Sequence, residues 1–176
     1  MDHATLADLR ARAPDLSESH HLGGRKWRAR IEDIHLDLYV SHLSELGRAL
    51  RLPVESLLDH QVSIDAYRTV GAEALVVAKA AALLDRAGSL PGRKDAADLR
   101  ALLGAGAGTW DWSVTAGVAG ASRAGRGPAL VAEALRHLDD PDLGRAERRA
   151  LRDRLAPAWA ALGQPPDPSP DPPASR

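Results

Sequence analysis

The chain of 176 residues contains no cysteine and no phenylalanine. Without cysteine it can form neither a disulfide framework nor a zinc site built on thiolates, and it has no thiol nucleophile. Its apolar runs are all shorter than the roughly 18 residues needed to cross a bilayer, and its first residues lack the basic start and apolar core of a signal peptide. We therefore expect a cytoplasmic protein without membrane contact.

An excess of charge of either sign is also missing. The 23 lysines and arginines nearly balance the 24 aspartates and glutamates, which gives a formal net charge of −1. A near-neutral chain has no global field that would recruit nucleic acid. Nucleic acid is therefore an unlikely partner except as an acceptor substrate. Zinc-ligand spacing of the H-E-x-x-H type and the glycine-rich phosphate loop are both missing from the sequence.

The hydrophobic periodicity predicts an α+β fold. Residues 25–40 alternate between apolar and polar and indicate a β-hairpin, and residues 61–70 suggest two further short strands. Together they predict a small antiparallel or mixed sheet that is packed by helices and followed by a helical C-terminal half. Helices are expected over residues 2–13, 53–58, 72–86, 93–103, 110–123, 128–138 and 145–162.

Three regions follow from this pattern. Residues 1–103 contain every predicted strand, and residues 104–163 form a helical C-terminal subdomain after a glycine-rich break at 104–108. Residues 164–176 consist mostly of proline, aspartate and serine, a composition that cannot bury a core. This tail is expected to be disordered.

The hairpin register can be predicted because only residues 32–33 separate the two strands. A two-residue loop pairs Arg28 with Asp37 and Trp27 with Leu38, so that every cross-strand pair matches in polarity. One face is apolar and must be covered by helices. The polar face carries Lys26, Arg28, Arg30, His35, Asp37 and Tyr39.

Lys79 is the one charged residue in the otherwise apolar stretch 74–84. An ammonium is seldom placed among apolar neighbours without an anion. That anion is either a ligand phosphate or an acid on the next helix, Asp95 or Asp98. The first alternative predicts nucleotide binding that is lost in Lys79→Ala, and the second predicts a large loss of stability on the same substitution because a buried acid is orphaned.

Arg86 lies seven residues after Lys79, about two helical turns along the same face. With the small Ala82 between them, both cations could line one groove. Asp95 and Asp98 share a face of the following helix, where we expect them to orient Arg86 or Lys79.

Asp37 is the candidate metal ligand, because a strand carboxylate beside a basic strand suits a divalent cation next to a polyphosphate. The alternative is a cross-strand ion pair with Arg28 on a solvated face, and the geometry alone favours that reading.

Two stretches taken in order resemble the minimal nucleotidyltransferase superfamily, the group that includes the AbiEii-type toxins. They are Ile34-His35-Leu36-Asp37-Leu38-Tyr39-Val40 and Lys79-x-x-Ala82-x-x-x-Arg86-x7-Lys94-Asp95-x-x-Asp98. The resemblance covers roughly residues 2–103. It implies an enzyme that transfers a nucleotidyl group from a nucleoside triphosphate with Mg²⁺.

The resemblance also implies roles for individual residues. Asp37 would be the catalytic and metal-binding carboxylate. Lys79, Arg86 and Arg28 would bind the nucleotide. Asp95, Asp98 and Lys94 would support these cations.

The first motif of that family, a glycine segment followed by paired aspartates, is missing before Asp37. The resemblance therefore implies an N-terminally truncated or degenerate form with little transfer activity. Its uncovered sheet edge would be covered by a protein partner or by a homodimer. The alternative function is a non-catalytic protein-interaction module in which the lysine, arginine and aspartate set is structural. A third idea, an RNA-binding ribbon based on Lys26, Arg28 and Arg30, predicts strong salt dependence.

Overall fold

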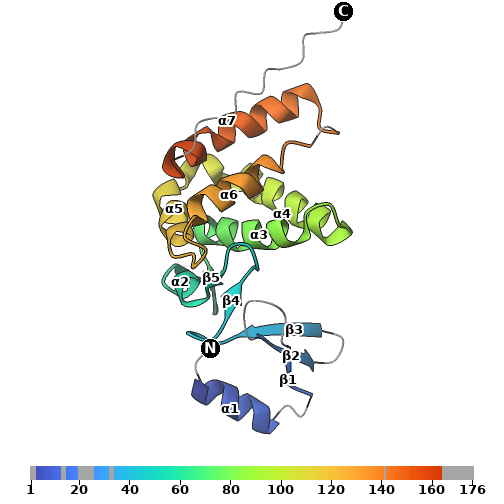
Figure 1. The fold of residues 1–176 in the computed structure, drawn as a ribbon, viewed down its shortest axis with the longest axis vertical. Helices are drawn as coiled ribbons and strands as arrows, with labels where there is room; N and C mark the ends of the chain where they lie inside the picture. Colours follow the sequence, from blue (N-terminus) through green and yellow to red (C-terminus); the bar gives the residue numbers. More distant parts are fainter. Residues whose placement is uncertain (1–2, 13–14, 20–25, 32–33, 141, 164–176) are drawn as a thin grey trace, which may run out of the picture.

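The computed structural model describes residues 3–12, 15–19, 26–31, 34–140 and 142–163. These residues form seven α-helices and three small antiparallel sheets, which confirms the α+β class. Figure 1 shows the two parts of the molecule: a three-stranded sheet with one helix at the N-terminal end, and a stack of helices above it. The tail at 164–176 lies outside the described residues.

The N-terminal part contains α1 (His3–Arg12), β1 (Ser17–Ser19), β2 (Lys26–Ile31) and β3 (Ile34–Tyr39). The strand order is β1-β2-β3, and β2 pairs with β3 in the predicted register, with Arg28 opposite Asp37. Residues 17–19, for which the sequence predicts no strand, form an edge strand because they pair with β2. The hairpin loop itself, residues 32–33, lies outside the described part of the chain.

A small core holds this part together. Leu6 of α1 packs with Trp27 and Val40, and each of these side chains is buried. Partly buried neighbours complete the cluster: Leu16, Leu38 and Leu43. The part of the hairpin's apolar face around Trp27 and Leu38 is therefore covered by α1. The prediction that helices cover the whole face is wrong at the loop end, where Ile34 is 62% exposed.

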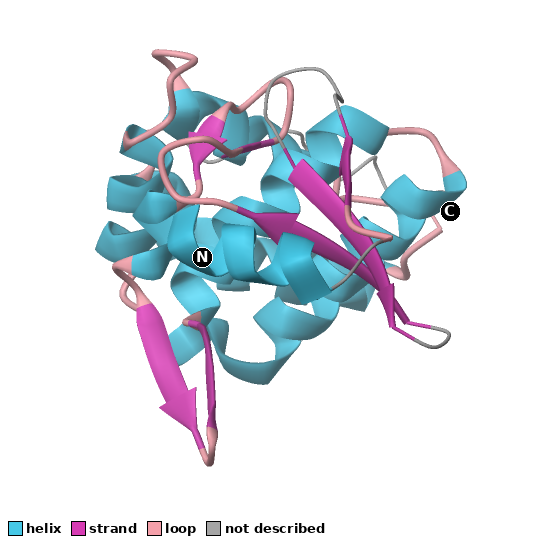
Figure 2. Cartoon of the chain, turned by 90° about the horizontal axis from the view of Figure 1, so that it is seen from below, coloured by secondary structure: helices cyan, strands magenta, loops and turns pink. Residues whose placement is uncertain are grey.

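Short elements connect this sheet to the helices. They are β4 (Glu45–Leu46), β5 (Leu52–Pro53), α2 (Glu55–Leu58), β6 (Gln61–Ile64) and β7 (Tyr67–Val70). The helix expected from residue 53 begins at Glu55 instead, because Pro53 pairs with Glu45 in a two-stranded ribbon. β6 and β7 form a ribbon of their own, which Figure 2 shows projecting away from the helices.

The helical body consists of α3 (Ala72–Arg86), α4 (Leu90–Gly106), the 3₁₀ turn η1 (Ala107–Thr109), α5 (Trp112–Gly120), α6 (Gly127–Arg136) and α7 (Arg145–Ala161). The predicted glycine-rich break at 104–108 is wrong in its first half, since α4 continues through Gly106. Leu99 and Leu103 on α4 are almost fully buried, and this burial outweighs the roughly 1 kcal/mol that a helical glycine costs.

α3 lies at the centre of the large core. Val76, Val77 and Ala80 have no exposed surface, and they pack in one cluster with side chains of α4, α5, α6 and α7. That cluster contains residues from both sides of position 103/104. The domain boundary predicted there stays a prediction. Among the described residues, every helix is too short or too polar to span a membrane.

Candidate functional site

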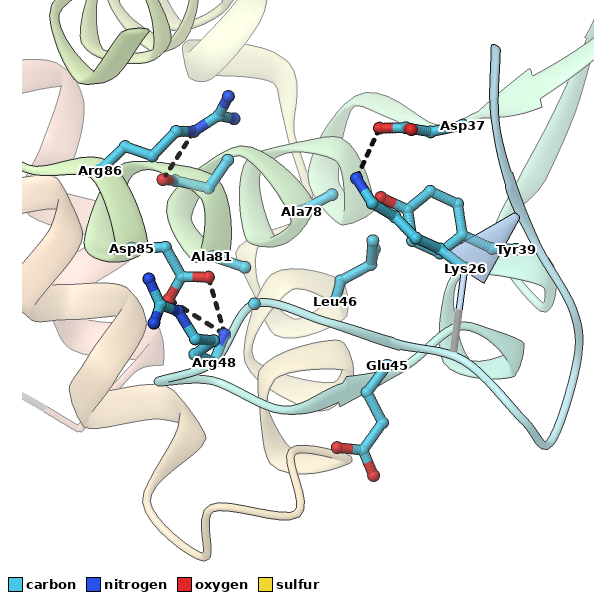
Figure 3. A pocket seen from close by; sticks show the side chains of 12 residues that line it. Lys26, Asp37, Tyr39, Glu45, Leu46, Arg48, Ala78, Ala81, Asp85 and Arg86 are labelled. Carbon is cyan, nitrogen blue, oxygen red and sulfur yellow. Dashed lines mark hydrogen bonds and ion pairs between the residues drawn. The ribbon is translucent and has the colours of Figure 1, made fainter. Parts of the chain in front are cut away.

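A cleft of about 370 Å³ lies between the polar face of the N-terminal sheet and α3. Lys26 and Tyr39 come from the sheet, and Ala78 and Arg86 come from α3 (Figure 3). The rest of its lining is Asp37, Glu45, Leu46, Gly47, Arg48, Ala81, Ala82 and Asp85. The cleft therefore brings the predicted residues Asp37 and Arg86 to one site.

On the sheet side of the cleft, Asp37 contacts two cations, of which Lys26 lines the cleft and Arg28 lies outside it. Its Oδ2 accepts a hydrogen bond of 2.8 Å from Lys26 Nζ, and its Oδ1 lies 3.3 Å from Nε of Arg28. Partial burial raises the pKa of the Asp37 carboxyl, but the hydrogen bonds and charges of Lys26 and Arg28 outweigh it and hold that pKa below its usual value. The predicted cross-strand pair of Arg28 and Asp37 is confirmed.

Tyr39 lies beside Lys26 and points into the same space (Figure 3). Burial and then the charge of Asp37 raise the pKa of its phenol, against the opposing charges of Arg86 and Arg28. The hydroxyl therefore stays protonated at neutral pH and can donate a hydrogen bond to a ligand oxygen.

Small residues make the opposite wall. Gly47 approaches α3 so closely that a Cβ at this position would lie 2.9 Å from Cβ of Ala81. The Asp85 carboxylate, one turn further along α3, accepts hydrogen bonds from the backbone N–H groups of Arg48 at 2.7 and 3.0 Å and of Ala49 at 3.1 Å. The loop after β4 is thereby fixed to α3, and it holds Arg48 at the cleft.

Arg86 is fixed by the neighbouring helix. Its Nη2 lies 3.0 Å from Oδ2 of Asp95, whose side chain is only 7% exposed. Within the described residues no well-aligned hydrogen bond reaches that oxygen, so the attraction is chiefly between the two charges. Nε of Arg86 also donates to the Ala82 carbonyl at 3.4 Å. The prediction that Asp95 orients Arg86 or Lys79 is confirmed for Arg86.

Lys79 lies outside the cleft. Its Nζ donates a 2.6 Å hydrogen bond to Oδ2 of Asp98 on α4, and Lys94 adds a second positive charge near that carboxylate. Lys79 and Arg86 lie seven residues apart on one face of α3, and both reach an acid on α4. Only Arg86, at the C-terminal end of α3, also lines the cleft, so the predicted shared groove is not this cleft.

The Lys79 pair is also more exposed than the sequence suggested. The side chains of Lys79 and Asp98 are 32% and 38% exposed. Water can solvate either partner after the other is removed, so the large stability loss expected for a buried pair does not apply here. Lys79 thus joins α3 to α4 at the surface of the helix pair.

A magnesium site finds little support in the geometry. Both oxygens of Asp37 already face cations, and the described residues include no group of three or more metal-ligating side chains. Transfer by a two-metal mechanism places its ions between several carboxylates. A single carboxylate paired with two cations does not fit that arrangement.

The balance of charge in the cleft favours an anion. Each lining acid is matched by a cation or by backbone donors: Lys26 and Arg28 for Asp37, the N–H groups of Arg48 and Ala49 for Asp85, and Arg51 and Arg123 for Glu45. Figure 3 shows the Glu45 carboxylate turned away from the other labelled side chains. Arg48 is exposed, and its guanidinium forms no ion pair with the residues that the structure describes.

Sequence reasoning missed Arg48, Asp85 and Gly47. Arg48 follows a glycine in a stretch with no regular pattern, and Asp85 looks like an ordinary surface residue on an amphipathic helix. Only the contact between the loop and α3 gives them a role. For Lys26 and Tyr39 the alternating pattern gave a weak signal, because it placed both on the polar face of the hairpin.

Comparisons with protein-family models, with curated proteins and with solved structures find no significant match. The resemblance to nucleotidyltransferases therefore stands on the residues quoted for it.

Acid is expected to destabilise the protein. The pKa of each of four carboxyls is lowered in the folded state: Asp37, Glu55, Asp98 and Asp111. A carboxyl with a lowered pKa contributes stability above its ordinary value of about 4, and the contribution is lost as the pH falls through the folded pKa. Thermal unfolding followed from roughly pH 6 to pH 3 should show a falling midpoint. The slope should be shallower in Asp37→Asn, and a midpoint that rises on acidification would contradict the prediction.

Proposed function

We propose that the cleft binds the phosphates of a nucleoside triphosphate, and that the chain is part of a nucleotidyltransferase-like protein. One observation carries the proposal: three cations from three different elements, Lys26, Arg48 and Arg86, line one cleft. The cleft also contains Asp37 and Arg86, two of the residues to which the nucleotidyltransferase resemblance assigns a role.

A polyphosphate suits these groups better than a single carboxylate does. Guanidinium groups donate paired hydrogen bonds to phosphate oxygens, and an ammonium adds a point charge. Lys26 and Arg86 line the cleft while paired with Asp37 and Asp95, and each has further N–H donors beyond those pairs. Tyr39 supplies a neutral donor or a ring face for the sugar or base.

The proposal concerns binding rather than transfer. Asp37 is a single carboxylate held between two cations, so the described residues supply groups that bind and orient a nucleotide but not a complete transfer site. We expect little or no transfer activity from this chain alone.

Arg48→Ala is the clearest test of the proposed site. This substitution removes a cleft cation without orphaning an acid, since the contacts of Arg48 with Asp85 are made by its backbone N–H. We expect the protein to bind ATP or GTP with Mg²⁺ in a calorimetric or NMR titration, and the variant to bind about tenfold more weakly, which corresponds to the loss of roughly one charge-assisted hydrogen bond.

Lys79→Ala is the matched control. Lys79 is also a cation, but it is paired with Asp98 outside the cleft, so its removal should leave nucleotide affinity unchanged. Binding that is lost in Lys79→Ala and kept in Arg48→Ala would place the phosphates elsewhere. The binding proposal would be contradicted if the amide spectra of the folded protein did not change on addition of nucleotide.

The second candidate is a non-catalytic interaction module. The observation in its favour is the pair of bridges from α3 to α4, Lys79 with Asp98 and Arg86 with Asp95, which accounts for four charged residues of the second motif without a ligand. The nucleotide titration separates the two candidates, because an interaction module is not expected to bind nucleotide.

A further inference from the structure

The ribbon of β6 and β7 exposes an unusual amount of apolar surface. Figure 2 shows it standing clear of the helical body, joined to it only at its base. Val62 is 45% exposed, Ile64 is 58% exposed and Tyr67 is 78% exposed. Three of the five exposed large hydrophobic side chains among the described residues therefore lie on this short ribbon.

The register places these side chains on one face. Val62 is opposite Thr69, and Ile64 is opposite Tyr67 across the two-residue loop. Successive residues of a strand point to opposite faces, so all four side chains project from the same side. A two-stranded ribbon that packs on nothing is marginally stable in water, whereas a sheet of three or more strands with an apolar face is stable.

The free edge of β6 is ready for pairing. Ile64 and Tyr67 flank the loop and form the hydrogen-bonded pair that closes it. Because hydrogen-bonded and non-hydrogen-bonded pairs alternate in an antiparallel ribbon, the backbone N–H and C=O groups of Ser63 point outward. The edge Gln61–Ile64 carries no charged side chain. Charged side chains are the usual protection of a strand edge against edge-to-edge pairing.

We propose that β6 pairs with β6 of a second copy of this chain, so that two ribbons form one four-stranded antiparallel sheet. A twofold axis at Ser63 places Ser63 opposite Ser63 of the second copy and Val62 opposite Ile64 of that copy. Gln61 then faces Asp65 of the second copy, a turn residue with a left-handed backbone (φ 53°), so the strand ladder itself covers residues 62–64. Every cross-strand pair matches in polarity, and the apolar side chains of both copies form one continuous face.

The other edge of the ribbon is less suited to this contact. By the same alternation, Arg68 is the β7 residue whose backbone groups point outward. A twofold axis there would place Arg68 opposite Arg68 of the second copy, and like charges directly opposite one another destabilise a strand pair. The uncharged β6 edge is therefore the one that pairs with itself.

Antiparallel strands run in opposite directions, so the two helical bodies lie at opposite ends of the proposed four-stranded sheet. The contact is short, since β6 contains four residues. Interfaces of this size fall in the weak, reversible class, and the dimer is expected to depend on protein concentration.

The test is sedimentation velocity over a roughly hundredfold concentration range. The protein should shift from monomer to dimer as its concentration rises. Val62→Lys, which places a lysine at the β6 edge, should remain monomeric. Thr69→Lys is the matched control, because it places the same side chain on the same face, directly across the ribbon but on β7, and it should still form the dimer.

A second measurement uses the unmodified protein. Hydrogen exchange of the Ser63 amide should slow as the concentration rises, because its N–H gains a partner only in the dimer. A monomer at every concentration would overturn the proposal, as would a dimer that Val62→Lys leaves intact. Circular dichroism spectra of both variants verify that they are folded, and the Ser63 exchange test holds even if Val62→Lys does not fold.

Discussion

Arg86→Ala is expected to weaken both the fold and the cleft. It leaves the Asp95 carboxylate, whose side chain is 7% exposed, without its counter-ion. Removing one partner of a fully buried pair costs about 3–5 kcal/mol. Because the Arg86 side chain is 49% exposed, we expect a smaller loss of about 2 kcal/mol in the free energy of unfolding, measured by urea denaturation.

The double variant Arg86→Ala with Asp95→Asn separates the two roles. A neutral amide no longer needs the arginine charge, so much of the lost stability should return. Nucleotide affinity should not return, because the cleft still lacks the Arg86 cation. A double variant that recovers affinity as well as stability would show that Arg86 acts only through the fold. One that recovers no stability would contradict the role of Asp95.

Gly92→Ala should have the largest effect on stability. A Cβ at this position would lie 2.1 Å from the carbonyl oxygen of Arg86 and 2.8 Å from its carbonyl carbon. Both are backbone atoms, so α3 and α4 would have to separate. Overpacking of this kind costs about 3 kcal/mol or more when no flexible side chain can yield. The loss is measurable as a lower midpoint of denaturant or thermal unfolding.

The damage should extend to the cleft, since the displaced segment carries Arg86. Gly104→Ala is the control on the same helix. Its nearest neighbour is an arginine nitrogen at 3.8 Å, an ordinary contact, so the alanine should be neutral or should stabilise α4 by up to about 1 kcal/mol. If the two substitutions lowered stability equally, the close approach at Gly92 would not explain the loss.

Local patterns were enough to predict most of the elements. The register of β2 and β3 followed from matched polarity across a two-residue connection, and α3 was predicted with the bounds that the structure has. The strand at Ser17–Ser19 and the start of α2 were not predictable, because both depend on pairing with a distant segment. Such pairing leaves no periodic signal in a segment of two or three residues.

Part of the candidate site was also predictable from local patterns. Alternation on the hairpin placed Lys26, Asp37 and Tyr39 on one face, and helical spacing placed Arg86 on the same face as Lys79. Which of these cations Asp95 and Asp98 orient was left open by the sequence. The tertiary structure decided that each pairs with one acid and that only Arg86 lines the cleft, because the sheet packs beside the C-terminal end of α3.

By itself, the sequence determined the α+β class, the hairpin with its register, and the presence of cations that need anions near residues 79–98. These depend on local periodicity and on the cost of an unpaired charge. Only the tertiary structure decided that Arg48, held through its backbone by Asp85, joins Arg86 and Lys26 at one cleft. It also decided that the β6–β7 ribbon stands apart with its apolar face exposed. Both outcomes depend on contacts between segments far apart in the chain, which local pattern does not encode.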